Sequence, residues 1–439
     1  MKGMKSMPTV NQDFPLSAER RKEKLKEIKR DSDSISTVKV PGYGPLPVYR
    51  IPLQFLSYNP YNTRFLSQAK TWQKRLGRKL SNEKPEDVKK IEEFLWEYKK
   101  DKNENTIKSL IKEGQLQPGV VTLDGLILAG NRRFRLLQEI TRHPETYGTH
   151  TGLQTFEAAI IDRVLLDKEI VQYESFYQYG AEDKVDYDPI QKYIAAKEQN
   201  DFGFSLSEIA ANFAALTNGN EKTVQLWLNV YELMAEYLDY IEEPEIYTAL
   251  TGNEESFLNL LDTITSLKRG RTKNVSWDYS DFDIDDLKLR YFDYIRMGLP
   301  THRFRIFKEV FLTKNRWESF NASVEETVSR ASEEIPSLDE YRSSHPDETE
   351  ETISAIRRND YEEKTKNQLN QLYGAENAFI VSKAEEATPY KIAQQAYQKL
   401  EKLAMLLENG PGVIADTDEL LEKVRSIQKI TGKIKMKLD

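Results

Sequence analysis

Residues 106–138 read TIKSLIKEGQLQPGVVTLDGLILAGNRRFRLLQ. The centre of this segment contains two apolar, strand-like runs, residues 120–123 and residues 126–128. Asp124-Gly125 separates the two runs, and this pair of residues is typical of the turn in a tight β-hairpin. A helical stretch is expected before the hairpin, ending at Gly114, because glycine is a favourable residue at a helix C-terminus.

A candidate anion site follows the hairpin, where Gly130 precedes a helix expected over residues 131–141. Glycine has no side chain, so a ligand can approach the backbone there. The unpaired N–H groups and the dipole at a helix start favour an anion. Arg132 and Arg133 add guanidinium groups that suit bidentate phosphate binding. The sequence predicts a phosphate site at residues 130–133, with Arg135 facing either the same side or solvent. The alternative is an ordinary turn whose arginines pair with acidic neighbours.

Length and composition exclude several classes of protein. The chain has 439 residues, which favours two or three domains. It has no cysteine, so disulfides, thiolate zinc sites and cysteine nucleophiles are excluded. No run of about 18 apolar residues occurs, and the N-terminus lacks the apolar core of a signal peptide. These features predict a cytoplasmic protein with no membrane partner.

The charge is unevenly distributed. The net charge is -8, yet basic clusters occur at residues 20–30, 70–79 and 268–273. A local basic face on an acidic protein can still bind DNA, because the attraction to phosphates is short-ranged in salt. The alternative is that each cluster is the solvated face of a helix.

The predicted fold class is α+β, with a small mixed domain followed by predominantly α-helical domains. Residues 1–45 are expected to form a flexible tail, because they contain few apolar anchors. The mixed domain is expected at 46–165, a helical domain at 166–244, and a helical region of unknown role at 245–439. Residues 336–350 are polar and predict a linker or loop.

The expected helical domain contains a candidate helix-turn-helix. Ser205 caps a short helix over residues 205–213, and Glu208 completes a capping box with it. A second helix is expected over residues 221–234. The pair either reads DNA in the major groove, through Lys222, Thr223 and Gln225, or is a plain helical pair that packs the domain.

Two amphipathic helices close the chain. Apolar residues line one face of each: Ile392, Ala396, Leu400, Leu403 and Leu407 in the first, and Leu420, Val424, Ile427, Ile434 and Leu438 in the second. Gly410-Pro411 separates the helices, and Asp416 with Glu419 caps the second one. This pattern predicts either a simple helical hairpin or a self-association element, and it favours a homo-oligomer.

Several motifs together resemble the N-terminal domain of the ParB partition proteins, within the ParB/sulfiredoxin-like superfamily. The motifs that match are Asn59-Pro60 with Arg64, residues 107–118 ending in Gln117-Pro118, the strand and box over residues 126–135, Glu174, Asp188-Pro189-Ile190-Gln191, and the helix-turn-helix over residues 205–233. The resemblance covers residues 48–241 and keeps the order of the elements. Sulfiredoxin chemistry is excluded because it needs a cysteine.

The resemblance implies a nucleotide cofactor and DNA as a partner. It assigns phosphate contact to Gly130, Asn131, Arg132 and Arg133. It places Gln117 and Pro118 near the nucleotide base and makes Glu174 the metal ligand. The cofactor it implies is CTP or ATP, with or without Mg²⁺. The function it implies is nucleotide-dependent DNA binding, in plasmid or chromosome partition or in phage defence.

Some positions depart from the family pattern. Asn131 replaces a glutamate of the box, and Ser175 and Gln178 replace an asparagine and an arginine that follow Glu174 in the family. Nucleotide binding is therefore favoured over hydrolysis. Two alternatives stay open: an NTPase or nuclease of a DNA-modification or phage-defence system, and an interaction protein whose nucleotide site has decayed. An enzyme would need a base or metal ligand, for which the candidates are Glu174, Glu113 and Asp124, and no catalytic residue is assigned.

Overall fold

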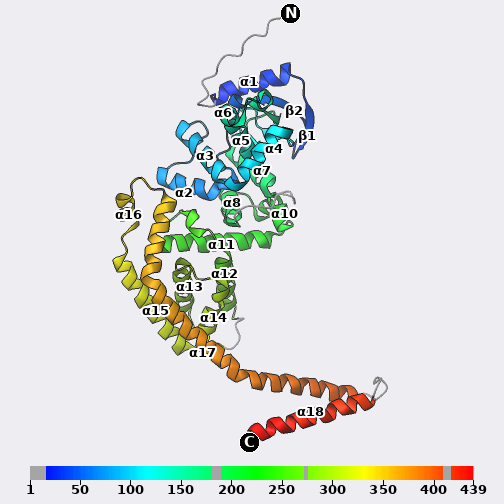
Figure 1. Cartoon of the computed structure of the whole chain (residues 1–439), viewed down its shortest axis with the longest axis vertical. Coiled ribbons are helices and arrows are strands. Elements are labelled where there is room, and N and C mark those ends of the chain that lie inside the picture. The colour runs from blue at the N-terminus through cyan, green and yellow to red at the C-terminus, as the bar shows by residue number, and fades with distance from the viewer. Residues whose placement is uncertain (1–15, 180–188, 271–274, 409–416, 439) are drawn as a thin grey trace, which may run out of the picture. The chain divides into compact units, whose positions relative to one another are not determined.

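The computed structural model describes residues 16–179, 189–270, 275–408 and 417–438 (Figure 1). The other residues lie outside this description, including residues 1–15 of the expected tail, Asp188, residues 271–273 of the third basic cluster, Gly410-Pro411 and Asp416. The chain divides into two compact units, residues 1–372 and residues 373–439, each of which is considered by itself.

Five strands form one mixed sheet in the order β1-β2-β5-β3-β4. They are β1 (Ser36–Val40), β2 (Gly44–Pro52), β3 (Gly119–Val121), β4 (Ile127–Ala129) and β5 (Thr155–Ile160). Strand β3 runs parallel to β5, and the other neighbouring strands are antiparallel. The expected hairpin is confirmed: β3 pairs with β4, and Gly125 in the turn between them has φ +81°.

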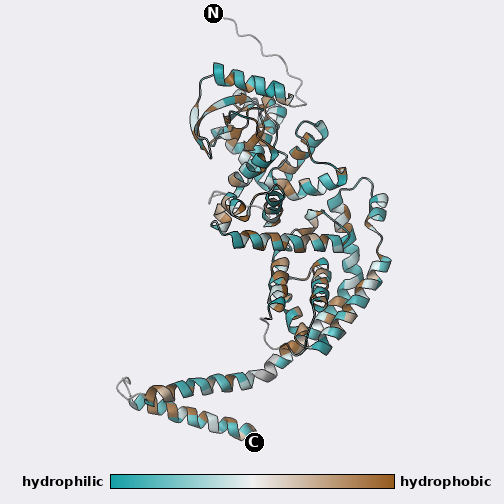
Figure 2. Cartoon of the chain, turned by 180° about the vertical axis from the view of Figure 1, so that it is seen from behind, coloured by the Kyte–Doolittle hydropathy of each residue, from teal (hydrophilic) through white to brown (hydrophobic). Residues whose placement is uncertain are grey.

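Hydrophobic residues run along the strands (Figure 2) and face both sides of the sheet, because successive side chains of a strand point to opposite faces. On one face, Phe156 of β5 packs in a large cluster with Phe134 and with residues of several helices. On the other face, Ala159 of β5 packs in a smaller cluster with Val120 and with Ile170. The sheet is thus buried on both sides.

The helices of this mixed part are α1 (Ala18–Asp31), α2 (Leu66–Leu76), α3 (Pro85–Glu97), α4 (Asn103–Glu113), α5 (Asn131–Arg142) and α6 (Pro144–Tyr147). Short 3₁₀ turns connect them: η1 (Leu53–Phe55), η2 (Thr63–Phe65), η3 (Lys100–Lys102) and η4 (Thr151–Gln154). The helix expected over residues 131–141 is confirmed and is one residue longer.

The flexible tail expected over residues 1–45 is wrong for its described part. Residues 18–31 form α1, and residues 36–40 form β1 at the edge of the sheet. Leu25 is fully buried in the larger cluster, and the buried Arg21 donates from Nε to the carbonyl of Asp124 at 2.7 Å. The apolar side chains of Leu25 and the partly buried Ile28, with the long stem of Arg21, dock this polar helix.

A helical part follows, with α7 (Asp167–Tyr179), α8 (Pro189–Asp201), α9 (Leu206–Asn212), α10 (Ala214–Thr217) and α11 (Glu221–Tyr240). The capping box between Ser205 and Glu208 is confirmed. Helix α11 runs six residues past the expected end at 234, because Tyr237 and Leu238 continue its buried face.

The remaining elements are η5 (Tyr247–Leu250), α12 (Glu254–Lys268), α13 (Asp281–Arg296), η6 (Thr301–Arg303), α14 (Arg305–Phe311), α15 (Lys314–Glu334), α16 (Leu338–Ser344), α17 (Glu350–Glu408) and α18 (Thr417–Leu438). The linker expected at 336–350 is in part a helix, α16, which Ser337 and Glu340 cap as a capping box. None of the helices among the described residues has the length and apolar character needed to cross a membrane.

Candidate functional site

Three motifs that are far apart in the sequence meet at one loop. The loop carries Asn59 and Arg64 and lies between η1 and α2. Its backbone N–H at Asn59 donates to Oδ1 of Asn131 at 3.0 Å, and the Asn59 side chain donates to Oε2 of Glu174 at 2.9 Å. The structure therefore brings the asparagine-proline motif, the arginine box and Glu174 together.

Glu174 comes from α7, and its carboxylate is committed to this loop. The backbone N–H and the hydroxyl of Thr63 donate to Oε1 at 3.1 and 3.3 Å, while Asn59 occupies Oε2. Only 2% of Glu174 is exposed. Burial raises the pKa of Glu174, and the nearby Arg64 charge opposes this rise. The carboxylate thus holds the loop in place, next to Arg64.

Gly130 is the N-cap of α5, with φ +104°, a conformation that L side chains rarely adopt. A Cβ at this position would lie 2.8 Å from Cζ of Phe156, so the buried ring also requires a glycine. No side chain caps this helix start. The first N–H groups of an α-helix have no partner within the helix.

Asn131, the first residue of α5, is buried. Its amide donates from Nδ2 to the carbonyl of Ile127 at 2.9 Å, in addition to accepting from Asn59. Both ends of the side chain are therefore used within the protein. A phosphate at this position would meet the backbone N–H of Asn131 rather than its side chain.

Arg132, Arg133 and Arg64 form a cluster of like charges, which we call the arginine cluster. Burial, together with the charge of Arg64, lowers the pKa of both Arg132 and Arg133. The Arg64 guanidinium makes no hydrogen bond or ion pair with any residue in the described part of the chain. Nε of Arg132 is buried and lacks a hydrogen-bond partner among the same residues. The cluster thus keeps donor capacity that the described residues leave unused, while Glu174 lies near Arg64 and Asp101 near Arg132.

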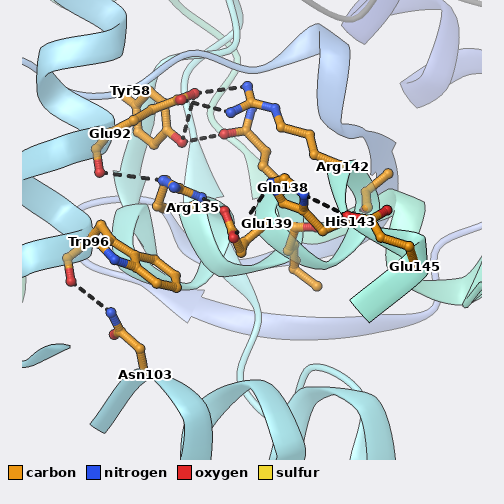
Figure 3. Close-up of polar contacts among 12 residues, drawn as sticks. Tyr58, Glu92, Trp96, Asn103, Arg135, Gln138, Glu139, Arg142, His143 and Glu145 are labelled. Carbon is orange, nitrogen blue, oxygen red and sulfur yellow. Dashed lines mark hydrogen bonds and ion pairs between the residues drawn. The ribbon is translucent and has the colours of Figure 1, made fainter. Parts of the chain in front are cut away.

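Asn103, at the start of α4, fixes the orientation of Arg132. It accepts from Nη2 of Arg132 at 2.9 Å and donates to the carbonyl of Trp96 at 2.7 Å. Only 1% of Asn103 is exposed. Figure 3 shows Asn103 reaching Trp96 at the end of α3. Sequence reasoning missed Asn103, because nothing local distinguishes a buried asparagine at a helix start.

Helix α5 is held against α3 by the polar network in Figure 3. The guanidinium of Arg142 makes a two-point contact with the carboxylate of Glu92, at 2.7 and 2.9 Å. Arg135 pairs with Glu139 at 2.8 Å and lies 5.1 Å above the Trp96 ring. Arg135 therefore belongs to this network and not to the arginine cluster. The sequence had left open whether Arg135 faces the phosphate site or solvent.

The two residues expected near a nucleotide base lie beside Arg133. Gln117 is exposed, and its carbonyl accepts a hydrogen bond from Nη1 of Arg133. Pro118 is half-buried and leads into β3. This edge of the arginine cluster is thus open to solvent at Gln117.

The candidate DNA-contacting residues start helix α11. Lys222 and Gln225 are exposed, whereas Thr223 is half-buried. Nε2 of Gln225 donates to Oδ1 of Asn229 at 3.0 Å, one turn further along the helix. Lys222 is the one basic residue in α11, so the phosphate attraction offered by this helix itself is small.

The candidate acids for an enzyme do not come together. Asp124 accepts from the hydroxyl of Thr122 at 2.5 Å in the hairpin turn, and Glu113 is exposed at the end of α4. Within the described residues, no group of three or more His, Cys, Asp or Glu side chains is placed to hold a metal ion. In comparisons with known proteins, no family model, no curated protein and no solved structure matches this chain.

Proposed function

We propose that this chain binds the phosphates of a nucleotide, CTP or ATP, at residues 130–133, and that the bound nucleotide governs its action on DNA. The observation that carries the proposal is the arginine cluster. Like charges that are held together and partly desolvated cost free energy. A bound polyphosphate would offset that cost through charge-assisted hydrogen bonds from the guanidinium groups.

The start of α5 supports the same ligand. Its N–H groups and dipole favour negative charge, and the left-handed Gly130 leaves the helix start without a side-chain cap. The loop that carries Arg64 is held against this helix through Asn131 and Glu174. The backbone segments that carry the three arginines are therefore held in place before a ligand binds, which lowers the entropy cost of binding.

Binding without rapid hydrolysis is the form of the proposal that these residues favour. The Glu174 carboxylate accepts three hydrogen bonds from Asn59 and Thr63, so it holds the loop instead of a metal ion. Asn131 offers no carboxylate. Mg²⁺ would then arrive with the nucleotide, held mainly by its phosphates.

The test is equilibrium binding of fluorescent CTP and ATP to the full chain, with and without duplex DNA, while phosphate release is followed. We expect saturable binding of at least one nucleotide and slow release of phosphate. Failure to bind either nucleotide would overturn the proposal and favour an interaction protein. Rapid phosphate release that does not depend on DNA would favour the NTPase alternative.

A further inference from the structure

The unit formed by residues 373–439 exposes an unusual amount of apolar surface. Of the twenty large hydrophobic side chains that the described residues expose, fourteen belong to this unit and six to the much longer rest of the chain. Large exposed apolar patches on a water-soluble surface mark sites of association. Figure 2 shows hydrophobic and hydrophilic residues alternating along the two terminal helices.

The apolar residues of these helices follow a heptad pattern. In α18 the spacing alternates between four and three residues through Leu420, Val424, Ile427, Thr431, Ile434 and Leu438, of which only Thr431 is polar. In the last part of α17 the same alternation runs through Ala393, Ala396, Leu400, Leu403 and Leu407. A sustained spacing of this kind is the pattern of helices that pack side by side in bundles.

The apolar residues form a stripe along each terminal helix, and this stripe is wider than one partner helix can cover. Beside the heptad core positions, α18 carries Leu421 and Ile430, and α17 carries Ile392 and Leu406. A stripe that includes such flanking positions is typical of a helix in a larger bundle, whereas a two-stranded seam needs only the core positions.

Burial within the unit shows how much of the stripe is unpartnered. Helix α18 runs antiparallel to the end of α17 (Figure 1), and Leu403, Val424 and Ile427 are half-buried. Further along α18 on the same face, Ile434 is 53% exposed and Leu438 is 82% exposed. The hairpin therefore leaves one end of its own apolar face open.

Charge indicates what covers this face. From Lys423 to Leu438 the chain carries six basic residues and no acidic one. The opposite end of the unit is acidic, with Glu401, Glu408, Asp418, Glu419 and Glu422 against the single base Lys402. Two copies in antiparallel orientation would place each basic end against an acidic end. Two copies in parallel orientation would place like charges together.

We propose that this unit is a dimerisation module, in which two copies of the chain pair their terminal helices as an antiparallel four-helix bundle. The proposal is independent of nucleotide binding. An anionic membrane is a poorer fit to the same face, because the acidic end of the unit would be repelled by it.

The first test is sedimentation equilibrium of the full chain over a range of concentrations. The informative variant is Ile434→Glu, and its matched control is Met436→Glu, which places the same charge two residues away on the opposite side of α18. We expect the wild type and Met436→Glu to be dimers, and Ile434→Glu to raise the dissociation constant at least tenfold. Leu438→Glu, at another exposed position of the open face, should act like Ile434→Glu.

Circular dichroism of each variant checks that the helices remain folded. A wild type that stays monomeric at every concentration would overturn the proposal, as would equal effects of Ile434→Glu and Met436→Glu. A monomer that instead sediments with phosphatidylserine vesicles through α18 would assign the face to membranes and also overturn it.

The second test concerns orientation and uses the absence of cysteine from the chain. A single spin label at Lys437→Cys reports the distance between the two copies of one end of α18. The 22 residues of α18 span about 33 Å, so the antiparallel dimer predicts a separation of about 30 Å. A label at Gln428→Cys, near the middle of the helix, serves as the control. A short distance at both positions would contradict the antiparallel arrangement.

Discussion

The side chain of Asn131 joins two segments that are 72 residues apart, accepting from the backbone N–H of Asn59 at 3.0 Å. Its amide nitrogen donates to the carbonyl of Ile127 in the adjacent strand β4. Asn131 thus has a structural role in this chain. It fixes the loop of Arg64 to the helix that carries Arg132 and Arg133.

Replacing Asn131 by alanine should destabilise the fold. The change leaves the N–H of Asn59 and the carbonyl of Ile127 buried without this partner, at a cost of about 1–3 kcal/mol. Urea unfolding followed by circular dichroism measures the loss. Asn105→Ala, at an exposed position of α4, is the control and should change stability by less than about 0.5 kcal/mol. Equal stabilities of the two variants would contradict the assigned role.

Gly130→Ala should destabilise the protein for two reasons. The left-handed backbone conformation costs an L residue roughly 1–2 kcal/mol, and the added Cβ would meet the Phe156 ring at 2.8 Å. Gly152→Ala is the control, because its Cβ would point into open space. Thermal unfolding should give a clearly lower midpoint for Gly130→Ala. A midpoint equal to that of the control would show that the helix start tolerates a side chain.

Asp293 on α13 should make stability depend on pH. It is fully buried beside Tyr240, and burial raises its pKa from 3.8 to about 6, with Arg290 and Arg296 opposing the rise. Between these pH values the folded state holds a proton that the unfolded state has lost. The contribution of Asp293 to stability is therefore present below about pH 4 and is lost as the pH rises to 6.

Asp293→Asn removes this titration. The free energy of unfolding of the wild type minus that of the variant should fall by about 3 kcal/mol between pH 4 and pH 7, since one pKa unit corresponds to about 1.4 kcal/mol. Urea titrations at several pH values measure both proteins. Parallel pH profiles would rule out a protonated Asp293 in the folded state.

Lys222→Ala tests whether the start of α11 touches DNA. Loss of one phosphate contact should weaken binding and lower the slope of log affinity against log salt by about 0.9. Fluorescence anisotropy with a labelled duplex at several salt concentrations gives both quantities. Lys314→Ala, an exposed lysine at the start of α15, should leave the slope unchanged. If the two variants behave alike, α11 is a packing helix.

Local signals in the sequence predicted much of the fold around the site. Asp124-Gly125 predicted the hairpin, and the periodicity after Gly130 predicted α5, because both depend on neighbouring residues. The docking of α1 could not be predicted in this way, since it depends on Arg21 reaching Asp124 across the sequence. Helix α16 differs from α1, because it begins with a local signal: Ser337 and Glu340 form the same capping box as Ser205 and Glu208.

The site itself could be predicted only in part. Gly130, Arg132 and Arg133 share one helix start, so local sequence places them together. Asn103 and Arg64 reach the cluster from other elements. The sequence motif singled out Arg64 but not its position beside Arg132, and it gave no sign of Asn103. The hydrogen bond that Glu174 accepts from Asn59, 115 residues away, likewise could not be predicted from the sequence.

The most direct test of the central claim is nucleotide affinity of Arg132→Ala, measured by calorimetry with CTP and with ATP. Arg50→Ala is the matched control, because Arg50 is an exposed arginine on β2 that pairs with Glu157 outside the arginine cluster. A charged hydrogen bond to phosphate is worth about 1.5–3 kcal/mol, so Arg132→Ala should weaken binding by roughly 10- to 100-fold. Arg50→Ala should bind like the wild type. Unchanged affinity in Arg132→Ala would contradict a phosphate site at residues 130–133.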